Sequence, residues 1–255
     1  MRIVFRVDAS LEIGSGHVMR CLALADIFQE NGAKVQFICR KYKGNLISKI
    51  ISKGFIVLEL DDSNSSKCDH KLFHSHWLGA SQKKDSEDCL SFLKQESVSW
   101  LIIDHYGIDE DWQTYLKGNY QKLMVIDDLA DRRHQCDLLL DQTFGRQKID
   151  YKNLVPETSN LILGSKYALL RPEFKTWREY SLDRRKAPSL RELLINMGGM
   201  DNQNVTKIVL EEISRCNLPK DINITIIMGA LSPHLKSIKI LAKNLCYRAS
   251  VKVEV

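Results

Sequence analysis

The sequence predicts an α/β protein built on doubly wound parallel sheets, and three features agree on this. Short apolar runs alternate with helical patterns along the chain, at the spacing of βαβ units. Two β-rich runs, Trp100–Asp104 and Lys122–Asp128, end in acidic residues, as buried parallel strands do when their carboxyl ends face a site. The composition, 44% hydrophobic and 27% charged, is that of a folded globular protein.

The first part of the chain carries the elements of one complete domain. Arg2–Arg6 is predicted to be its first strand, and a polar loop with two glycines, 8–16, follows. Apolar residues then recur at helical spacing from Val18 to Phe28, and this helix is expected to stop at Asn31-Gly32. Further strands are expected at 35–39, 55–60, 138–140 and 161–163, and a further helix at 45–52. The long polar segment 61–88 is predicted to be a functional or mobile loop.

A second domain is expected after a basic and aromatic stretch. We place a first domain at 1–165, a linker at 166–188 and a partial second domain at 189–255. The second domain is predicted to contain strands at 193–197, 222–228 and 251–255 and helices at 205–216 and 233–245.

Charge and cysteine usage exclude several classes of partner. The net charge of +5 is not concentrated in a basic block, so no nucleic-acid partner is expected, whereas a small phosphorylated ligand fits. The seven cysteines form no C-x-x-C pair and are expected to be reduced. No signal peptide and no apolar run of membrane-spanning length is found. We therefore expect a soluble cytoplasmic protein with no membrane partner.

The strongest local motif, Gly14-Ser15-Gly16-His17, lies between the first strand and the first helix. Two glycines allow a tight turn and the close approach of a ligand, and a helix start offers free N–H groups to an anionic or polar group. It is not the dinucleotide motif G-x-G-x-x-G, because Met19 occupies the place of the third glycine. It is not a P-loop either, which argues against both NAD and ATP.

His17 is the candidate general base. In the first turn of a helix the positive end of the dipole favours the neutral imidazole, which can accept a proton. The alternative is a partly buried capping or packing histidine. Arg6, Asp8, Asp104–Gly107 and Asp127–Asp128 are expected at the same sheet edge. The paired acids Asp127 and Asp128 fit orienting a base, contacting sugar hydroxyls or binding a metal, and they also fit capping the next helix, which is the commoner case.

Two further groups of residues are candidate ligand sites. His74 and His76, with Cys68 and His70 nearby, match no usual zinc spacing, so no metal site is predicted. Gly198-Gly199 follows a strand and precedes a helix, which fits a diphosphate contact. It also fits a tight turn in which Asp201 or Asn202 caps the helix.

Seven short motifs, taken together and in order, resemble a known family. They are Phe5-Arg6-x-Asp8, Ile13-Gly14-x-Gly16-His17-x-x-Arg20, Trp77-Leu78-Gly79, Ile103-Asp104-His105-Tyr106-Gly107, Ile126-Asp127-Asp128, Tyr167-Ala168-Leu169-Leu170-Arg171-Pro172-Glu173-Phe174 and Met197-Gly198-Gly199-x-Asp201. Together and in this order, the motifs resemble those of the nucleotide-sugar hydrolases of pseudaminic acid biosynthesis, which cleave UDP from 2,4-diacetamido-2,4,6-trideoxy-β-L-altropyranose.

The resemblance implies two Rossmann-like domains of glycosyltransferase-B type, the first for catalysis and sugar binding and the second for nucleotide binding. It also implies an inverting attack of water on the anomeric carbon without metal or cofactor. Separately, we expect a monomer. His17 would activate the water, while Arg6, Asp8, Gly14 and Gly16 would shape the sugar pocket. His105, Tyr106 and Asp128 would contact the sugar or hold His17. The remaining substrate-binding candidates are Arg20, Arg171, Gly198 and Gly199.

The second domain departs from the family pattern. The chain stops at Val255 on a predicted strand, and no residues match the family's late UDP-binding motif, so this domain is expected to be incomplete. A UDP-sugar transferase, a 2-epimerase and a non-catalytic nucleotide-sugar-binding protein therefore remain as alternative functions.

Overall fold

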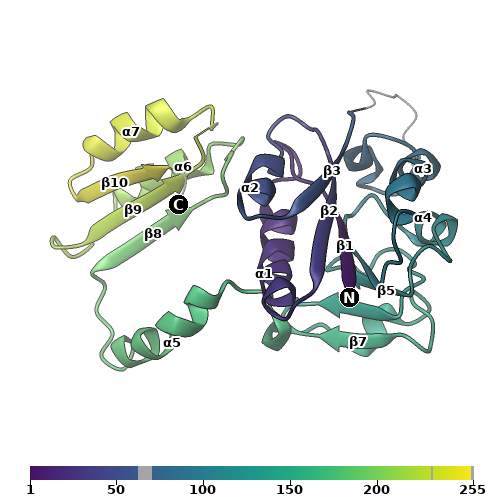
Figure 1. Ribbon diagram of the computed structural model, residues 1–255. Helices are drawn as coiled ribbons and strands as arrows, with labels where there is room; N and C mark the ends of the chain where they lie inside the picture. Colours follow the sequence, from purple (N-terminus) through teal and green to yellow (C-terminus); the bar gives the residue numbers. More distant parts are fainter. Residues whose placement is uncertain (63–70, 231, 254–255) are drawn as a thin grey trace. The chain divides into compact units, whose positions relative to one another are not determined.

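The computed structural model describes residues 1–62, 71–230 and 232–253, which form two units (Figure 1). Unit 1 is Met1–Pro172 and unit 2 is Glu173–Val255. The boundary between them falls inside the segment 166–188 that the sequence predicts as the linker. Among the described residues, no helix combines enough length with enough apolar character to cross a lipid bilayer.

Unit 1 is built on a parallel sheet of seven strands in the order β3-β2-β1-β4-β5-β6-β7. The strands are β1 (Arg2–Val7), β2 (Lys34–Arg40), β3 (Ile56–Leu60), β4 (Trp100–Asp104), β5 (Lys122–Ile126), β6 (Leu138–Asp141) and β7 (Asn160–Leu163). The order reverses between β1 and β4, and ligands of doubly wound sheets bind at the carboxyl ends of the strands at such a switch point. The fold class predicted from the apolar runs is thus confirmed.

Helices cover both faces of this sheet (Figure 1). They are α1 (Gly16–Glu30), α2 (Ile47–Ser52), α3 (Gln82–Leu93) and α4 (Glu110–Tyr115), with 3-10 turns η1 (Ser75–Leu78), η2 (Lys148–Tyr151) and η3 (Ser165–Tyr167). One core cluster joins α1 and α2 to the face of β1 that carries Phe5. The other joins α3 and α4 to the opposite face, which carries Val4. All of β1 is therefore buried, as expected of a central strand.

The predicted polar loop 61–88 is wrong over part of its length. It contains η1 and the first half of α3, whose N-cap Ser81 accepts a hydrogen bond from the Lys84 amide. The helix buries Asp85 and Ser86 against the sheet, so its inward face does not look apolar in the sequence. Residues 63–70, including Cys68 and His70, lie outside the described residues.

Unit 2 holds a parallel sheet of three strands in the order β10-β9-β8. Its elements are α5 (Pro172–Arg184), β8 (Glu192–Asn196), α6 (Val205–Ile213), β9 (Asn223–Met228), α7 (Leu235–Lys243) and β10 (Arg248–Val253). On β9, buried residues alternate with half-buried ones, and Ile224 and Ile226 pack with Leu210 of α6 and Ile238 of α7. β10 begins three residues before the predicted strand, while residues 254–255 lie outside the described part of the chain.

Candidate active site

The candidate site lies at the carboxyl ends of β1, β4 and β5. Strand register brings these ends together, since Val7 pairs with Asp104 and Ile103 pairs with Val125. The chain leaves β1, turns through Gly14 at a φ of +80° and enters α1 at Gly16. A side chain at Gly14 would be strained at this φ, which explains the glycine. The turn presents the open N-terminus of α1 at the edge of the sheet.

His17 and Asp104 form a buried pair at the start of α1. The two side chains are 2.6 Å apart from Nδ1 to Oδ1, and the Asp104 carboxyl has no exposed surface. Burial alone would raise the pKa of Asp104, but the charges of His17 and Arg20 and their hydrogen bonds hold that pKa well below its ordinary value. Asp104 is therefore a carboxylate that accepts the Nδ1–H of His17. With the ring proton on Nδ1, Nε2 is the nitrogen left to accept a proton, as a general base requires.

Arg20 lies one turn after His17 on α1 and binds the same carboxylate with two nitrogens. Its Nε is 2.6 Å from Oδ2 of Asp104 and its Nη2 is 2.6 Å from Oδ1. Nη1 donates to Oδ2 of Asp128, 2.8 Å away, in the loop after β5. Two predicted substrate-binding residues, Arg20 and Asp128, thus lie in one network with His17.

Aromatic rings pack around the imidazole of His17. The Tyr106 ring meets it edge-on with centroids 4.6 Å apart, and the Tyr106 hydroxyl donates to Asp128. Trp77 stacks on Tyr106 at 5.6 Å, and His74 lies 4.4 Å from Trp77. Trp77, Tyr106 and His74 are half-buried, so this aromatic cluster forms part of the surface beside the base. Such a surface suits the apolar face of a sugar ring.

Arg6 and Asp8 lie beneath this surface, with no exposed part of either side chain. Arg6 pairs with Asp8 at 2.8 Å and with Asp85 of α3 at 2.7 Å. Arg40 at the end of β2 binds Asp85 at 2.6 Å, and its amide donates to Asp8. The sequence predicted that Arg6 and Asp8 shape a sugar pocket. The structure instead gives them partners inside the protein, where they join the ends of β1 and β2 to α3.

His105 is equally buried and supports the turn that follows β4. Its Nδ1 accepts the amide N–H of Gly107, 3.0 Å away, and its Nε2 is 3.3 Å from Oδ2 of Asp8. Burial lowers the pKa of His105, so the ring is neutral with its proton on Nε2, facing Asp8. His105 therefore holds the backbone that follows Asp104, and its predicted role of contacting the sugar or holding His17 stays a prediction.

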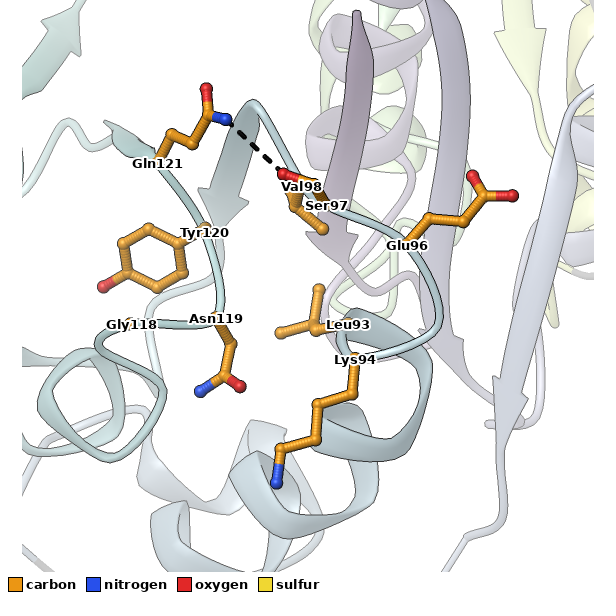
Figure 2. A pocket seen from close by; sticks show the side chains of 9 residues that line it. All are labelled: Leu93, Lys94, Glu96, Ser97, Val98, Gly118, Asn119, Tyr120 and Gln121. Atoms are coloured by element: carbon orange, nitrogen blue, oxygen red, sulfur yellow. Dashed lines mark hydrogen bonds between the residues drawn. The ribbon is translucent and has the colours of Figure 1, made fainter.

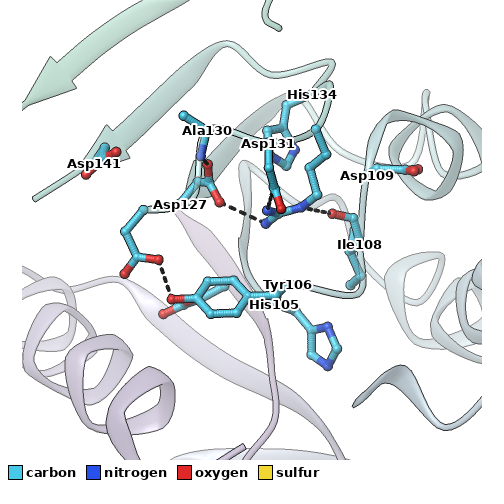
Figure 3. Close-up of polar contacts among 12 residues, drawn as sticks. His105, Tyr106, Ile108, Asp109, Asp127, Ala130, Asp131, His134 and Asp141 are labelled. Carbon is cyan, nitrogen blue, oxygen red and sulfur yellow. Dashed lines mark hydrogen bonds and ion pairs between the residues drawn. The ribbon is translucent and has the colours of Figure 1, made fainter. Parts of the chain in front are cut away.

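A second buried network fixes the loop after β5 (Figure 3). Asp127 accepts hydrogen bonds from the Ala130 amide at 3.0 Å and from the Tyr151 hydroxyl at 2.8 Å, and it pairs with Arg132 at 2.9 Å. Arg132 also donates to the carbonyl of Ile108, beyond β4. Of the two adjacent acids predicted here, Asp127 therefore holds the loop while Asp128 reaches the His17 network.

The remaining predicted site residues take part in none of the contacts described above for the His17 network. Gly16 is the exposed first residue of α1, and Arg171 is an exposed residue directly before α5. In unit 2, the Gly198 amide donates to Oδ1 of Asn196 in the turn after β8. Gly199 follows and accepts the amide of Gly229.

The helix after the glycine pair begins later than the alternative interpretation expected, since the N-cap of α6 is Asn204 and not Asp201 or Asn202. The Asp201 carboxylate still accepts hydrogen bonds from the amides of Val205 and Thr206, at 2.8 and 3.0 Å, in the first turn of α6. A contact of Gly198 or Gly199 with a diphosphate stays a prediction.

Three residues of the cluster were missing from the predicted site. Asp104 was recognised as a strand end but not as the partner of His17, although an acid at the end of a central strand is the signal that identifies it. Trp77 belongs to the motif Trp77-Leu78-Gly79, but the sequence gives no reason to assign it a binding or catalytic role. His74 was weighed only as a metal ligand, and the structure packs its ring against Trp77 and Tyr106. Among the described residues, no group of three or more His, Cys, Asp or Glu is arranged to hold a metal ion.

A shallow cavity of about 300 Å³ lies at the opposite edge of the sheet, before β4 and β5 (Figure 2). Lys94, Glu96, Asn119 and Tyr120 are among its lining residues. In doubly wound sheets ligands collect at the other edge, so this cavity does not alter the choice of site.

Comparison with known proteins identifies relatives over most of the chain. The chain is 32% identical to UDP-2,4-diacetamido-2,4,6-trideoxy-beta-L-altropyranose hydrolase of Campylobacter jejuni, over 95% of this chain and 75% of that protein. It is 27% identical to the uncharacterized protein MJ1062 of Methanocaldococcus jannaschii, over 100% of this chain and 48% of that protein. It is 22% identical to the spore coat polysaccharide biosynthesis protein SpsG of Bacillus subtilis, over 94% of this chain and 62% of that protein. A scan against models of protein families finds no match.

Solved structures of glycosyltransferases share the fold. MurG of Acinetobacter baumannii matches with a TM-score of 0.58 at 13% identity, over 99% of this chain and 67% of that one. TcCGT1 in complex with UDP matches with a TM-score of 0.57 at 13% identity, over 99% of this chain and 73% of that one. The expected glycosyltransferase-B type of fold is thereby confirmed.

Proposed function

The chain belongs to the UDP-2,4-diacetamido-2,4,6-trideoxy-β-L-altropyranose hydrolase family, and from this premise we propose that it hydrolyses that UDP-sugar to the free sugar and UDP. The observation that carries the proposal is the His17–Asp104 pair at the start of α1. A hydrolase of this kind needs a base for water, and a histidine oriented by a buried carboxylate supplies one.

The proposed reaction is a single inverting displacement. Nε2 of His17 takes a proton from a water molecule while the water oxygen bonds to the anomeric carbon. The bond between that carbon and the diphosphate oxygen breaks, and UDP leaves with the electron pair. Because the diphosphate is a good leaving group, the step needs no strong general acid. Asp104 stabilises the imidazolium that forms, and the proton then passes to solvent.

Other parts of the candidate site would bind rather than react. The aromatic cluster of His74, Trp77 and Tyr106 suits the apolar face of a deoxy sugar, which carries methyl groups rather than a full set of hydroxyls. Unit 2 would take the nucleotide, as expected for the second domain of this fold type. We further propose that the reaction belongs to pseudaminic acid biosynthesis, proceeds in the cytoplasm and uses neither a metal nor a cofactor.

The test is release of UDP from the altrose-type substrate by the unaltered chain in ¹⁸O-labelled water. We expect ¹⁸O at the anomeric carbon of the product and none in UDP, without any added acceptor and in the presence of a chelator. The His17→Ala variant should lose at least about 100-fold in kcat. His76→Ala, which removes an exposed histidine paired with Glu12, serves as the control. Equal rates in wild type and His17→Ala would refute the role of His17, and a requirement for an acceptor would identify a transferase instead.

A further inference from the structure

Arg20 makes its polar contacts within the protein itself. All three guanidinium nitrogens hydrogen-bond to carboxylates, with Nε and Nη2 on Asp104 and Nη1 on Asp128. Only 10% of the side chain is exposed. Three of the five guanidinium N–H groups are thus used within the protein on a side chain that is largely buried, which does not favour the role of a cation that binds a diphosphate at the surface.

We infer that Arg20 is a positioning residue for the His17 base rather than a substrate-binding cation. This inference rests on the proposed function. Arg20 holds the Asp104 carboxylate in the plane in which its Oδ1 accepts the Nδ1–H of His17.

The geometry supports this action because one carboxylate oxygen serves both partners. Oδ1 of Asp104 lies 2.6 Å from Nδ1 of His17 and 2.6 Å from Nη2 of Arg20. Nη2 is also 3.3 Å from Nδ1, which is a poorer contact than its 2.6 Å bond to the carboxylate. A guanidinium that binds with two parallel N–H groups fixes the plane of a carboxylate, which a single ammonium cannot do.

Arg20 is itself held from the other side, so the contacts close into a ring. Asp128 accepts Nη1 of Arg20 with Oδ2 and the Tyr106 hydroxyl with Oδ1. The Tyr106 ring in turn lies edge-on against His17. The ring runs from His17 on α1 to Asp104 on β4, back to Arg20 on α1, on to Asp128 after β5, to Tyr106 after β4 and back to His17. It restrains Arg20 and His17 together, as a site held by several elements requires.

Arg20 also moderates the charge that Asp104 presents to the imidazole. The other titratable groups near His17 are Tyr106 after β4 and His74, which feels a weak repulsion from His17. The Asp128 carboxylate accepts hydrogen bonds from Arg20 and Tyr106. Without Arg20, the Asp104 carboxylate would attract a proton to the imidazole more strongly. The acid limb of the rate profile would then move to higher pH.

The test compares Arg20→Gln and Arg20→Lys with Arg2→Gln. Arg2 is a matched control because it is also a buried arginine on unit 1, but it binds Gln36 and the carbonyls of Phe92 and Glu96 at the opposite edge of the sheet. For Arg20→Gln we expect kcat to fall about 100-fold with KM changed less than about threefold, because a misplaced base slows the reaction and not binding.

The pH profile and the lysine variant add readouts that a loss of stability would not move. The acid limb of kcat should move to higher pH in Arg20→Gln and stay in place in Arg2→Gln. Arg20→Lys keeps the charge but loses the paired donors, so it should restore the acid limb while kcat stays at least about tenfold low. A variant with a raised KM and an unchanged kcat would overturn the inference, because Arg20 would then contact the substrate.

A measurement without substrate separates this inference from the proposed function. In a proton NMR spectrum, the Nδ1–H of His17 should give a downfield resonance in the wild type and in Arg2→Gln. It should be lost or displaced in Arg20→Gln. An unchanged resonance there would overturn the positioning role whatever the activity. A wild type that has this resonance but releases no UDP would overturn the proposed function alone.

Discussion

Replacing Asp104 by asparagine tests the central pair of the candidate site directly. The change removes one negative charge and keeps the size of the side chain, at a position with no exposed surface. The asparagine amide can also donate to Nδ1 of His17, which would place the ring proton on Nε2. The base would then have its lone pair on the buried nitrogen, facing away from any water.

The expected loss can be worked from the distances. Two unit charges about 4 Å apart interact by about 4 kcal/mol at an effective dielectric constant of about 20. Arg20, 2.6 Å from the same carboxylate, offsets part of the attraction between Asp104 and an imidazolium. A remainder of about 2 to 3 kcal/mol corresponds to about 30- to 150-fold in kcat. The reversed tautomer adds to this, so the whole loss should lie between about 10² and 10⁴-fold.

The assay is release of UDP under single-turnover conditions. Asp137→Asn is a matched control, since Asp137 is a carboxylate of the same unit that binds Lys122 and the Leu123 amide at the opposite edge of the sheet. Asp104→Asn leaves Arg20 with a buried charge that lacks its main partner, which costs about 3 to 5 kcal/mol of stability. Rates are therefore normalised to the folded fraction measured by near-ultraviolet circular dichroism. A folded Asp104→Asn variant within threefold of the wild-type kcat would refute the role of the pair.

Three other predictions follow from the same contacts. Trp77→Ala should raise KM for the UDP-sugar about tenfold without a comparable loss of kcat, because it removes part of the aromatic surface beside the base; an unchanged KM would place the sugar elsewhere. Gly79→Ala should destabilise the protein by more than about 2 kcal/mol in urea unfolding, because a Cβ there would lie 2.3 Å from the Tyr42 hydroxyl at a φ of +65°. The control Gly54→Ala, at a φ of +88° with no atom within 4 Å of the added Cβ, should cost only about 1 kcal/mol. Equal costs of the two substitutions would contradict the clash at Gly79. Arginine partners hold the pKa of Asp85 low against the opposing effect of burial. The contribution of Asp85 to stability is therefore complete above the ordinary aspartate pKa of about 4 and is lost as pH falls below that value. In urea unfolding from pH 7 to pH 3, the free energy of unfolding should fall less steeply in Asp85→Asn than in wild type.

Local sequence was sufficient for the elements that position the site. Every strand of unit 1 was predicted within two residues of its observed bounds, because buried parallel strands are continuous apolar runs. The glycines before α1 predicted the turn and the open helix start, and His17 was identified there as the base. These features depend on residues that are neighbours in the chain.

The buried polar partners needed the tertiary structure. Asp104 is 87 residues from His17, Asp85 is 79 residues from Arg6, and Asp128 is 108 residues from Arg20. Nothing in the local pattern distinguishes an arginine that binds a ligand from one whose donors are taken by distant carboxylates.

The same reason explains the error over α3. Its inward face carries Asp85, whose charge is matched by arginines from β1 and β2, so it reads as polar and exposed until those strands are in place. The sequence by itself determined the α/β fold, the site edge and the candidate base. Tertiary structure alone decided which charges reach solvent, because burial of a charge depends on partners that the fold brings from elsewhere in the chain.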